Sequence, residues 1–304
     1  MTASLDRRAG ARTTTRLVTT TVLLAVSSVL FTAASPAVTA APSYDPVPGA
    51  ATFAGSVYTQ VAADGRGAFH MVSREDGLQQ AIVYRTSTDG GRTWVVAGRF
   101  TGESGGATRP QLAVDDGVVA IGFIGGYCSA PGLCGEAPYL VLATNRGLSI
   151  RGPVRTAGNA RNVAVAVDGA TVWFAHDGQN AGGGPIVSIR AFDSTSGAVV
   201  RSAEAAGYSP RLAAGDGAGV ATFVREVIDP VQGRLLVPTA RFLRGTAFAG
   251  VTELATVPVG LAAADGRVHL LFGQGPVAIT NYTVRTSSVG DGPGDATLGP
   301  QVAA

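Results

Sequence analysis

The side chains best suited to binding or catalysis lie in segments that separate short apolar runs. These segments are predicted loops at 73–80, 125–139, 175–185, 225–233 and 273–277. Arginines also precede three of the apolar runs. A planar guanidinium can hold a carboxylate through two parallel hydrogen bonds, so the pattern favours a polar or anionic ligand. The candidate ligand-binding residues are Arg109, Arg161, Arg211, His176, Asp177 and Glu226.

A second interpretation of the arginines stays open. All 23 basic residues are arginine, and the chain contains no lysine. Every exposed cation must therefore be arginine, and three arginines at loop ends are also what ordinary solvated positions would contain.

The composition excludes several classes of protein. Of 304 residues, 14% are charged and 46% hydrophobic, with 42 glycines, which excludes a disordered chain, a coiled coil and a basic nucleic-acid binder. We expect a globular, all-β protein.

The N-terminus has the order of a secretory signal peptide. Arg7, Arg8, Arg12 and Arg16 precede an apolar run over 17–34, and small residues follow as far as Ala40. We predict a signal peptide at 1–40 cleaved near Ala40, a short extension or ring-closing strand at 41–54, and a secreted domain at 55–304. A retained membrane anchor is the alternative. Cleavage would remove four arginines and one acid, so the basic isoelectric point indicates neither an acidic partner nor a membrane surface.

Cys128 and Cys134 are the two cysteines of the chain. An even number in an exported chain predicts one disulfide. The three histidines do not cluster with the cysteines in sequence, so we predict neither a metal site nor a cofactor.

One unit recurs five times in the mature region. Each copy has an apolar run, an Asp-Gly pair and a second apolar run, and the pairs begin at Asp64, Asp116, Asp168, Asp216 and Asp265. Asp-Gly between apolar runs predicts a tight β-hairpin. Units of this length predict four-stranded propeller blades, five most simply.

Two other architectures stay open. The tail at 300–304 resembles the start of a unit at 110–113. It could begin a sixth blade or close the ring, so six blades are the alternative. A β-sandwich is a third architecture, but it would not explain the phase of the repeats.

A second motif lies in the first unit. Ser87, Asp89, Gly91 and Trp94 form S-x-D-x-G-x-x-W, and weaker versions follow in phase. The motif resembles the Asp-box of the sialidase-like (BNR repeat) β-propellers. The resemblance implies a structural turn in which Asp and Ser satisfy backbone donors and Trp packs between sheets, with no catalytic role.

The resemblance also implies where a ligand binds. The Asp-Gly turns and Asp-boxes share one face, and ligands of such propellers bind over the axis on the other. The predicted loops, the three arginines and the disulfide would lie on that second face, with the disulfide at the rim of the pocket.

Sialidases, by the same resemblance, use a Tyr nucleophile assisted by Glu, an Asp acid and an arginine cluster. The weak candidates here are Tyr208, Tyr282, Glu226, Asp76 and Asp177. The Phe/Tyr-Arg-Ile-Pro motif of that family has no counterpart between 41 and 87.

We therefore expect a secreted propeller that binds a glycan or another extracellular or cell-surface ligand. An exo-acting glycoside hydrolase of the sialidase type is the alternative. A scaffold for protein partners is the second alternative.

Overall fold

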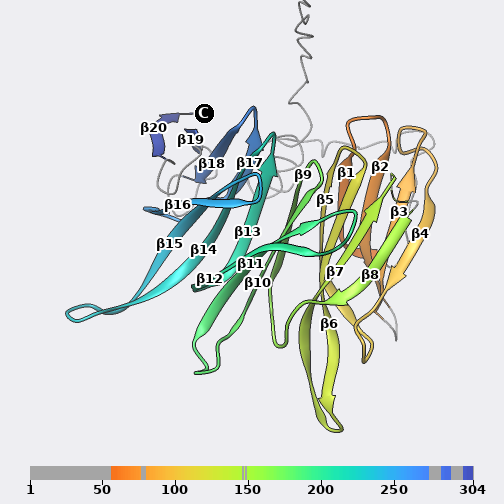
Figure 1. Cartoon of the computed structure of the whole chain (residues 1–304), viewed down its shortest axis with the longest axis horizontal. Coiled ribbons are helices and arrows are strands. Elements are labelled where there is room, and N and C mark those ends of the chain that lie inside the picture. Colours follow the sequence, from red (N-terminus) through yellow and green to blue (C-terminus); the bar gives the residue numbers. More distant parts are fainter. Residues whose placement is uncertain are drawn as a thin grey trace, which may run out of the picture. The chain divides into compact units, whose positions relative to one another are not determined.

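The computed structural model describes residues 56–76, 80–145, 147, 149–273, 282–288 and 297–303. Every element in these ranges is a β-strand, and the strands form five four-stranded antiparallel sheets (Figure 1). The predicted leader at 1–40 and the extension at 41–54 lie outside the described residues. In the described ranges no helix is long and apolar enough to cross a membrane.

Each sheet uses four strands that are consecutive in the sequence. The first sheet consists of β1 (Ser56–Ala63), β2 (Phe69–Glu75), β3 (Ile82–Ser87) and β4 (Val95–Phe100). The second consists of β5 (Ala107–Asp115), β6 (Val118–Ala130), β7 (Leu133–Thr144) and β8 (Ser149–Arg155). The third consists of β9 (Val163–Asp168), β10 (Thr171–Gln179), β11 (Pro185–Asp193) and β12 (Val199–Ala206). The fourth consists of β13 (Tyr208–Gly215), β14 (Ala218–Asp229), β15 (Gly233–Arg244) and β16 (Ala247–Glu253). The fifth consists of β17 (Gly260–Ala264), β18 (Arg267–Gly273), β19 (Tyr282–Ser288) and β20 (Thr297–Ala303).

The first strands of successive sheets lie next to one another. β1 contacts β5, β5 contacts β9, β9 contacts β13, and β13 contacts β17. Up-and-down sheets joined through their first strands are the arrangement of propeller blades. The predicted all-β class with four-stranded antiparallel blades is confirmed.

The C-terminal tail belongs to the fifth sheet. β20 pairs antiparallel with β19, with Arg285 opposite Gln301. The tail is therefore the fourth strand of that sheet, and the idea that residues 300–304 begin another blade was wrong.

The Asp-Gly hairpins are confirmed, with two local differences. Between β1 and β2 the connection is longer, over 64–68, and Asp64 does not have a positive φ. Asp116, Asp216 and Asp265 all have positive φ, as do the glycines that follow them. This matches a two-residue turn whose central positions both need a left-handed backbone. Between β9 and β10, however, Asp168 ends the strand and Gly169 takes the first turn position.

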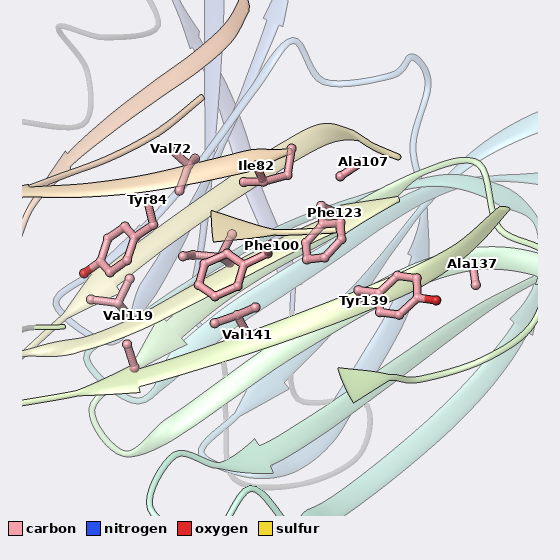
Figure 2. Close-up of a cluster of buried hydrophobic side chains, with 12 residues drawn as sticks. Val72, Ile82, Tyr84, Phe100, Ala107, Val119, Phe123, Ala137, Tyr139 and Val141 are labelled. Atoms are coloured by element: carbon pink, nitrogen blue, oxygen red, sulfur yellow. The ribbon is translucent and has the colours of Figure 1, made fainter. Parts of the chain in front are cut away.

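The apolar core lies between sheets that follow one another in the chain. In Figure 2, Tyr84 and Ile82 of the first sheet pack with Phe123 and Tyr139 of the second. Similar clusters join the second sheet to the third, the third to the fourth and the fourth to the fifth. Burying one such large apolar side chain contributes about 1.5–3 kcal/mol, so these contacts hold the sheets together.

Three predicted loops are largely strand. β6 and β7 continue through most of 125–139, β10 and β11 take up parts of 175–185, and β14 extends to Asp229. The loop prediction at these places was wrong. Two glycines of β6, Gly125 and Gly126, allow close packing at this place. A Cβ on Gly102 would lie 2.3 Å from the backbone N and O of Gly126, so only glycine fits.

The turn between β3 and β4 contains the Ser87 to Trp94 motif. Ser87 Oγ accepts a hydrogen bond from Gly91 N at 2.9 Å and donates to Asp89 Oδ1 at 2.7 Å. Asp89 Oδ1 also accepts from Thr93 N at 2.9 Å, and the Trp94 indole donates to Gly91 O at 2.9 Å. The carboxylate and hydroxyl therefore satisfy backbone donors of the turn. Hydrogen bonds from the Thr93 hydroxyl, the Thr93 N–H and the Ser87 hydroxyl hold the pKa of Asp89 well below its usual range.

Candidate functional site

Three sheets carry the same bulge near the start of their first strand. The pairing of β1 with β2 skips Tyr58 and Thr59, and Tyr58 has φ of +53°. β5 repeats this at Arg109 (φ +52°), and β13 repeats it at Ser209 (φ +56°). A left-handed first residue is the position that glycine usually takes in such bulges. Non-glycine residues held there are strained and concentrate at functional sites.

Two of these bulges border a cavity of about 260 Å³, which we call the bulge pocket. It lies between the beginnings of β1 and β5 and the segment that enters β9. Its lining residues are Tyr58, Thr59, Gln60, Arg109, Pro110, Gln111, Asn162 and Val163. No carboxylate occurs among these described lining residues.

Hydrogen bonds fix two amide side chains of the bulge pocket. Gln60 Oε1 accepts from Leu112 N at 2.8 Å, which links the first two sheets. Asn162 Nδ2 donates to Asp177 Oδ2 at 2.5 Å. The pocket is therefore built partly from side chains whose orientation is already set.

The predicted arginine cluster is not brought into one cavity. Arg109 lies in the bulge pocket, and its guanidinium donates to the backbone carbonyl of Arg161 in the segment that enters β9. Arg211 lines a separate cavity of about 60 Å³ and donates to Pro258 O at 3.0 Å and Val259 O at 3.3 Å. Both guanidinium groups thus connect one sheet to the next.

Asp177 has a comparable linking role. The residue is 7% exposed, and its carboxylate accepts hydrogen bonds from Arg161 N and Asn162 N, both at 2.8 Å. It also accepts from Ser209 N of the fourth sheet at 3.4 Å. A carboxylate that accepts these backbone hydrogen bonds is held in a structural position.

His176 is buried on β10. Its Nδ1 lies 3.0 Å from Asp177 O, and burial lowers the pKa of the imidazole. The imidazole is therefore neutral near pH 7 and is not among the lining residues of the bulge pocket.

The predicted Tyr-Glu pair lies on one side of the fourth sheet. Tyr208 pairs with Val224, two residues before Glu226 on β14. Glu226 forms an ion pair with Arg234, and this contact, with a smaller effect of Tyr208, raises the pKa of Arg234. The sheet thus brings Tyr208 and Glu226 near each other, away from the bulge pocket.

The remaining candidates are dispersed. Asp76 is exposed and pairs with Arg74 at 3.2 Å. Tyr282 begins β19, but its side chain lies outside the described residues, as does most of the predicted loop at 273–277. Over the described ranges no three His, Cys, Asp or Glu side chains gather as a metal site would.

The predicted disulfide is confirmed. Cys128 and Cys134 are bonded to each other and face each other across the end of the β6–β7 hairpin. The hairpin contributes no residue to the lining of the bulge pocket as described, so the predicted place at the pocket rim is not reproduced.

Sequence reasoning missed Tyr58, Gln60, Gln111 and Asn162. One signal was present, because Arg109-Pro110-Gln111 and Ser209-Pro210-Arg211 occupy the same place in two units. A proline near the start of an inner strand indicates an irregularity in that strand, and an irregularity near the axis is a place for a site.

Comparison with known proteins finds distant structural similarity. No protein-family model and no curated protein matches the chain. A protein of unknown function from Dyadobacter fermentans is similar, with a TM-score of 0.47 and 14% identity over 82% of this chain and 83% of that one. The acylaminoacyl peptidase of Pyrococcus horikoshii has a TM-score of 0.44 and 11% identity over 77% of this chain, which spans 38% of the peptidase. A subtype N10 neuraminidase-like protein of a little yellow-shouldered bat isolate has a TM-score of 0.44 and 8% identity over 82% of both chains. At these values the structures carry no information about the chemistry of the bulge pocket.

Proposed function

We propose that the protein is a secreted, five-bladed, sialidase-like β-propeller that binds a glycan without hydrolysing it. The observation that carries this proposal is the chemistry of the bulge pocket. Its described lining offers amide, hydroxyl and phenol groups and one guanidinium, and it has no carboxylate to act as acid, base or nucleophile.

Two observations support the propeller type. The Ser87 to Trp94 turn has the internal hydrogen bonds that an Asp-box requires. Five four-stranded sheets account for all the described strands, and β20 is the last strand of the fifth sheet. Five blades is therefore the simplest blade count.

The hydrogen bonds that Arg109, Arg211 and Asp177 make within the protein favour a binding function over hydrolysis. A hydrolase of the sialidase type needs guanidinium groups that converge on a substrate carboxylate. Here Arg109 and Arg211 donate to backbone carbonyls and line different cavities.

Secretion is supported by the disulfide, since such bonds persist in oxidising compartments.

A glycan array combined with a turnover assay tests the proposal. We expect binding to a subset of glycans and no release of fluorophore from a fluorogenic sialoside. An array without any bound glycan would contradict the proposal and favour the scaffold for protein partners.

A second candidate function has one observation in its favour. Tyr208 and Glu226 lie near each other beside Arg234, which is the pair that a sialidase-type hydrolase would use. The cavity that Arg211 lines has a volume of about 60 Å³, which is small for a sugar ring, and its lining includes neither Tyr208 nor Glu226. Sialoside turnover that disappears in both Tyr208→Phe and Glu226→Gln, with an unchanged urea midpoint, would establish the hydrolase.

A further inference from the structure

We propose that the bulge pocket binds one uncharged sugar ring, which stacks on Tyr58 and exchanges hydrogen bonds with Gln60, Gln111 and Asn162. This inference rests on the proposed glycan binding and gives it a position and a ligand class.

Tyr58 has the exposure and support of a stacking surface. Its side chain is 60% exposed although it borders a cavity. The Arg74 guanidinium carbon lies 5.2 Å from the ring centroid, and Asp76 pairs with Arg74 at 3.2 Å. The ring is thus supported on one face, and its exposed face offers the π-surface against which the C–H groups of a sugar ring pack.

The backbone conformation of Tyr58 is unfavourable for a residue with a side chain. Its φ of +53° is a left-handed conformation that a bulky residue rarely adopts. Glycine would occupy the first position of this bulge without strain. A strained aromatic residue at the edge of a cavity therefore points to a role for its side chain in binding.

The amide groups of the bulge pocket match hydroxyl groups. An amide offers both donors and an acceptor, as a sugar hydroxyl does. Because Gln60 Oε1 is used by Leu112 N and Asn162 Nδ2 is used by Asp177, Gln60 retains its Nε2 donors and Asn162 its Oδ1 acceptor. Groups that are oriented before binding lower the cost of ordering them.

One group of the pocket disfavours a carboxylate ligand. Arg109 donates one N–H to the Arg161 carbonyl, which holds its guanidinium in place, and its other N–H groups can donate to sugar hydroxyls. A ligand carboxylate would meet the Asn162 Oδ1 acceptor, which repels it. We therefore expect the pocket to prefer an uncharged ring.

Titration by NMR tests the inference on the whole folded protein. The uncharged probes are methyl β-galactopyranoside, methyl α-glucopyranoside and methyl α-mannopyranoside, and the anionic probe is the methyl glycoside of N-acetylneuraminic acid. We expect at least one uncharged probe to bind more tightly than the anionic one. Gln111→Ala should weaken that binding by about two- to tenfold, the effect of one lost hydrogen bond.

Tyr58→Gly separates binding from folding, because glycine relieves the backbone strain while it removes the ring. We expect about tenfold weaker binding with a urea midpoint no lower than that of the wild type. Ser209→Gly is the matched control, since Ser209 has the same left-handed bulge outside the pocket and glycine retains its N–H. This control should gain stability and bind the probe as the wild type does.

The outcomes separate the two proposals. Unchanged binding by Tyr58→Gly, or tighter binding of the anionic probe, would overturn the inference. Glycans bound on an array while none of the uncharged probes binds would overturn the pocket assignment and leave the proposed function standing. An array without bound glycans would overturn both.

Discussion

The Asp177 carboxylate accepts two hydrogen bonds from Asn162, one from its backbone N–H at 2.8 Å and one from its side-chain amide at 2.5 Å. These contacts fix the orientation of the Asn162 amide, which lines the bulge pocket, although Asp177 itself is not a lining residue. The same carboxylate accepts from Ser209 N at 3.4 Å, so it also joins the third sheet to the fourth.

Asp177→Asn should destabilise the fold by about 2 kcal/mol, because several donors lose a charged acceptor in a buried position. Urea unfolding followed by tryptophan fluorescence measures this loss. Asp76→Asn is the matched control, since Asp76 is exposed and its single ion pair contributes about 0–1 kcal/mol. Equal losses in the two variants would refute the linking role of Asp177.

The stability of the protein should fall as the pH drops below about 6.5. Burial lowers the pKa values of both His70 and His176, so each imidazole is neutral in the fold and takes up a proton more readily when unfolded. Their contribution is fully present above the unfolded pKa of about 6.5 and is lost toward the lower folded pKa, at about 1.4 kcal/mol per pH unit for each histidine. Urea unfolding between pH 7.5 and 5.5 measures the slope.

His176→Asn tests this assignment, because asparagine can still donate to Asp177 O while it does not titrate. The slope below pH 6.5 should become shallower, whatever the variant does to stability at pH 7.5. Identical slopes in variant and wild type would show that His176 does not contribute.

Gly102→Ala should destabilise the protein by about 1–3 kcal/mol, the usual cost of forcing extra atoms into a packed site. The new Cβ would lie 2.3 Å from backbone atoms of Gly126, which cannot move without shifting β6. The control is Gly182→Ala, whose Cβ would lie 3.4 Å from Asn180 Oδ1. A urea midpoint for Gly102→Ala that equals that of the control would argue against the close approach.

Removal of the disulfide should open one hairpin and leave the sheets intact. The bond closes a short loop, so the chain-entropy model gives about 2 kcal/mol, and both cysteines lie at an exposed tip. In the double variant Cys128→Ser, Cys134→Ser we expect faster hydrogen exchange over 126–136 and unchanged exchange in the β14–β15 hairpin. Faster exchange throughout both hairpins would contradict a local role.

Local rules made much of the fold predictable. Asp116-Gly117 and the equivalent pairs require hairpins because glycine tolerates a left-handed turn, and two cysteines six positions apart can bridge one hairpin. The loop prediction over 125–139 failed because β6 and β7 continue through this segment, where Gly125 and Gly126 allow Gly102 to pack against the strand. That contact depends on tertiary structure.

The site was predictable only in its general position. Arg109 was recognised as a residue before an inner strand, but the carbonyl that it reaches belongs to the segment that enters β9, which no local pattern specifies. The residues that flank Tyr58 in the sequence form no motif that would single it out. Its importance follows from a bulge and a cavity that exist only when the sheets are assembled.

Saturation-transfer NMR of the wild-type protein with methyl β-lactoside and 3′-sialyllactose tests the central claim most directly, because one sample reports both binding and turnover. The account predicts saturation transfer to the uncharged sugar, its loss in Tyr58→Gly, and no signals of released sugar during prolonged incubation. Released galactose or sialic acid that increases with protein concentration and disappears in Glu226→Gln would contradict it.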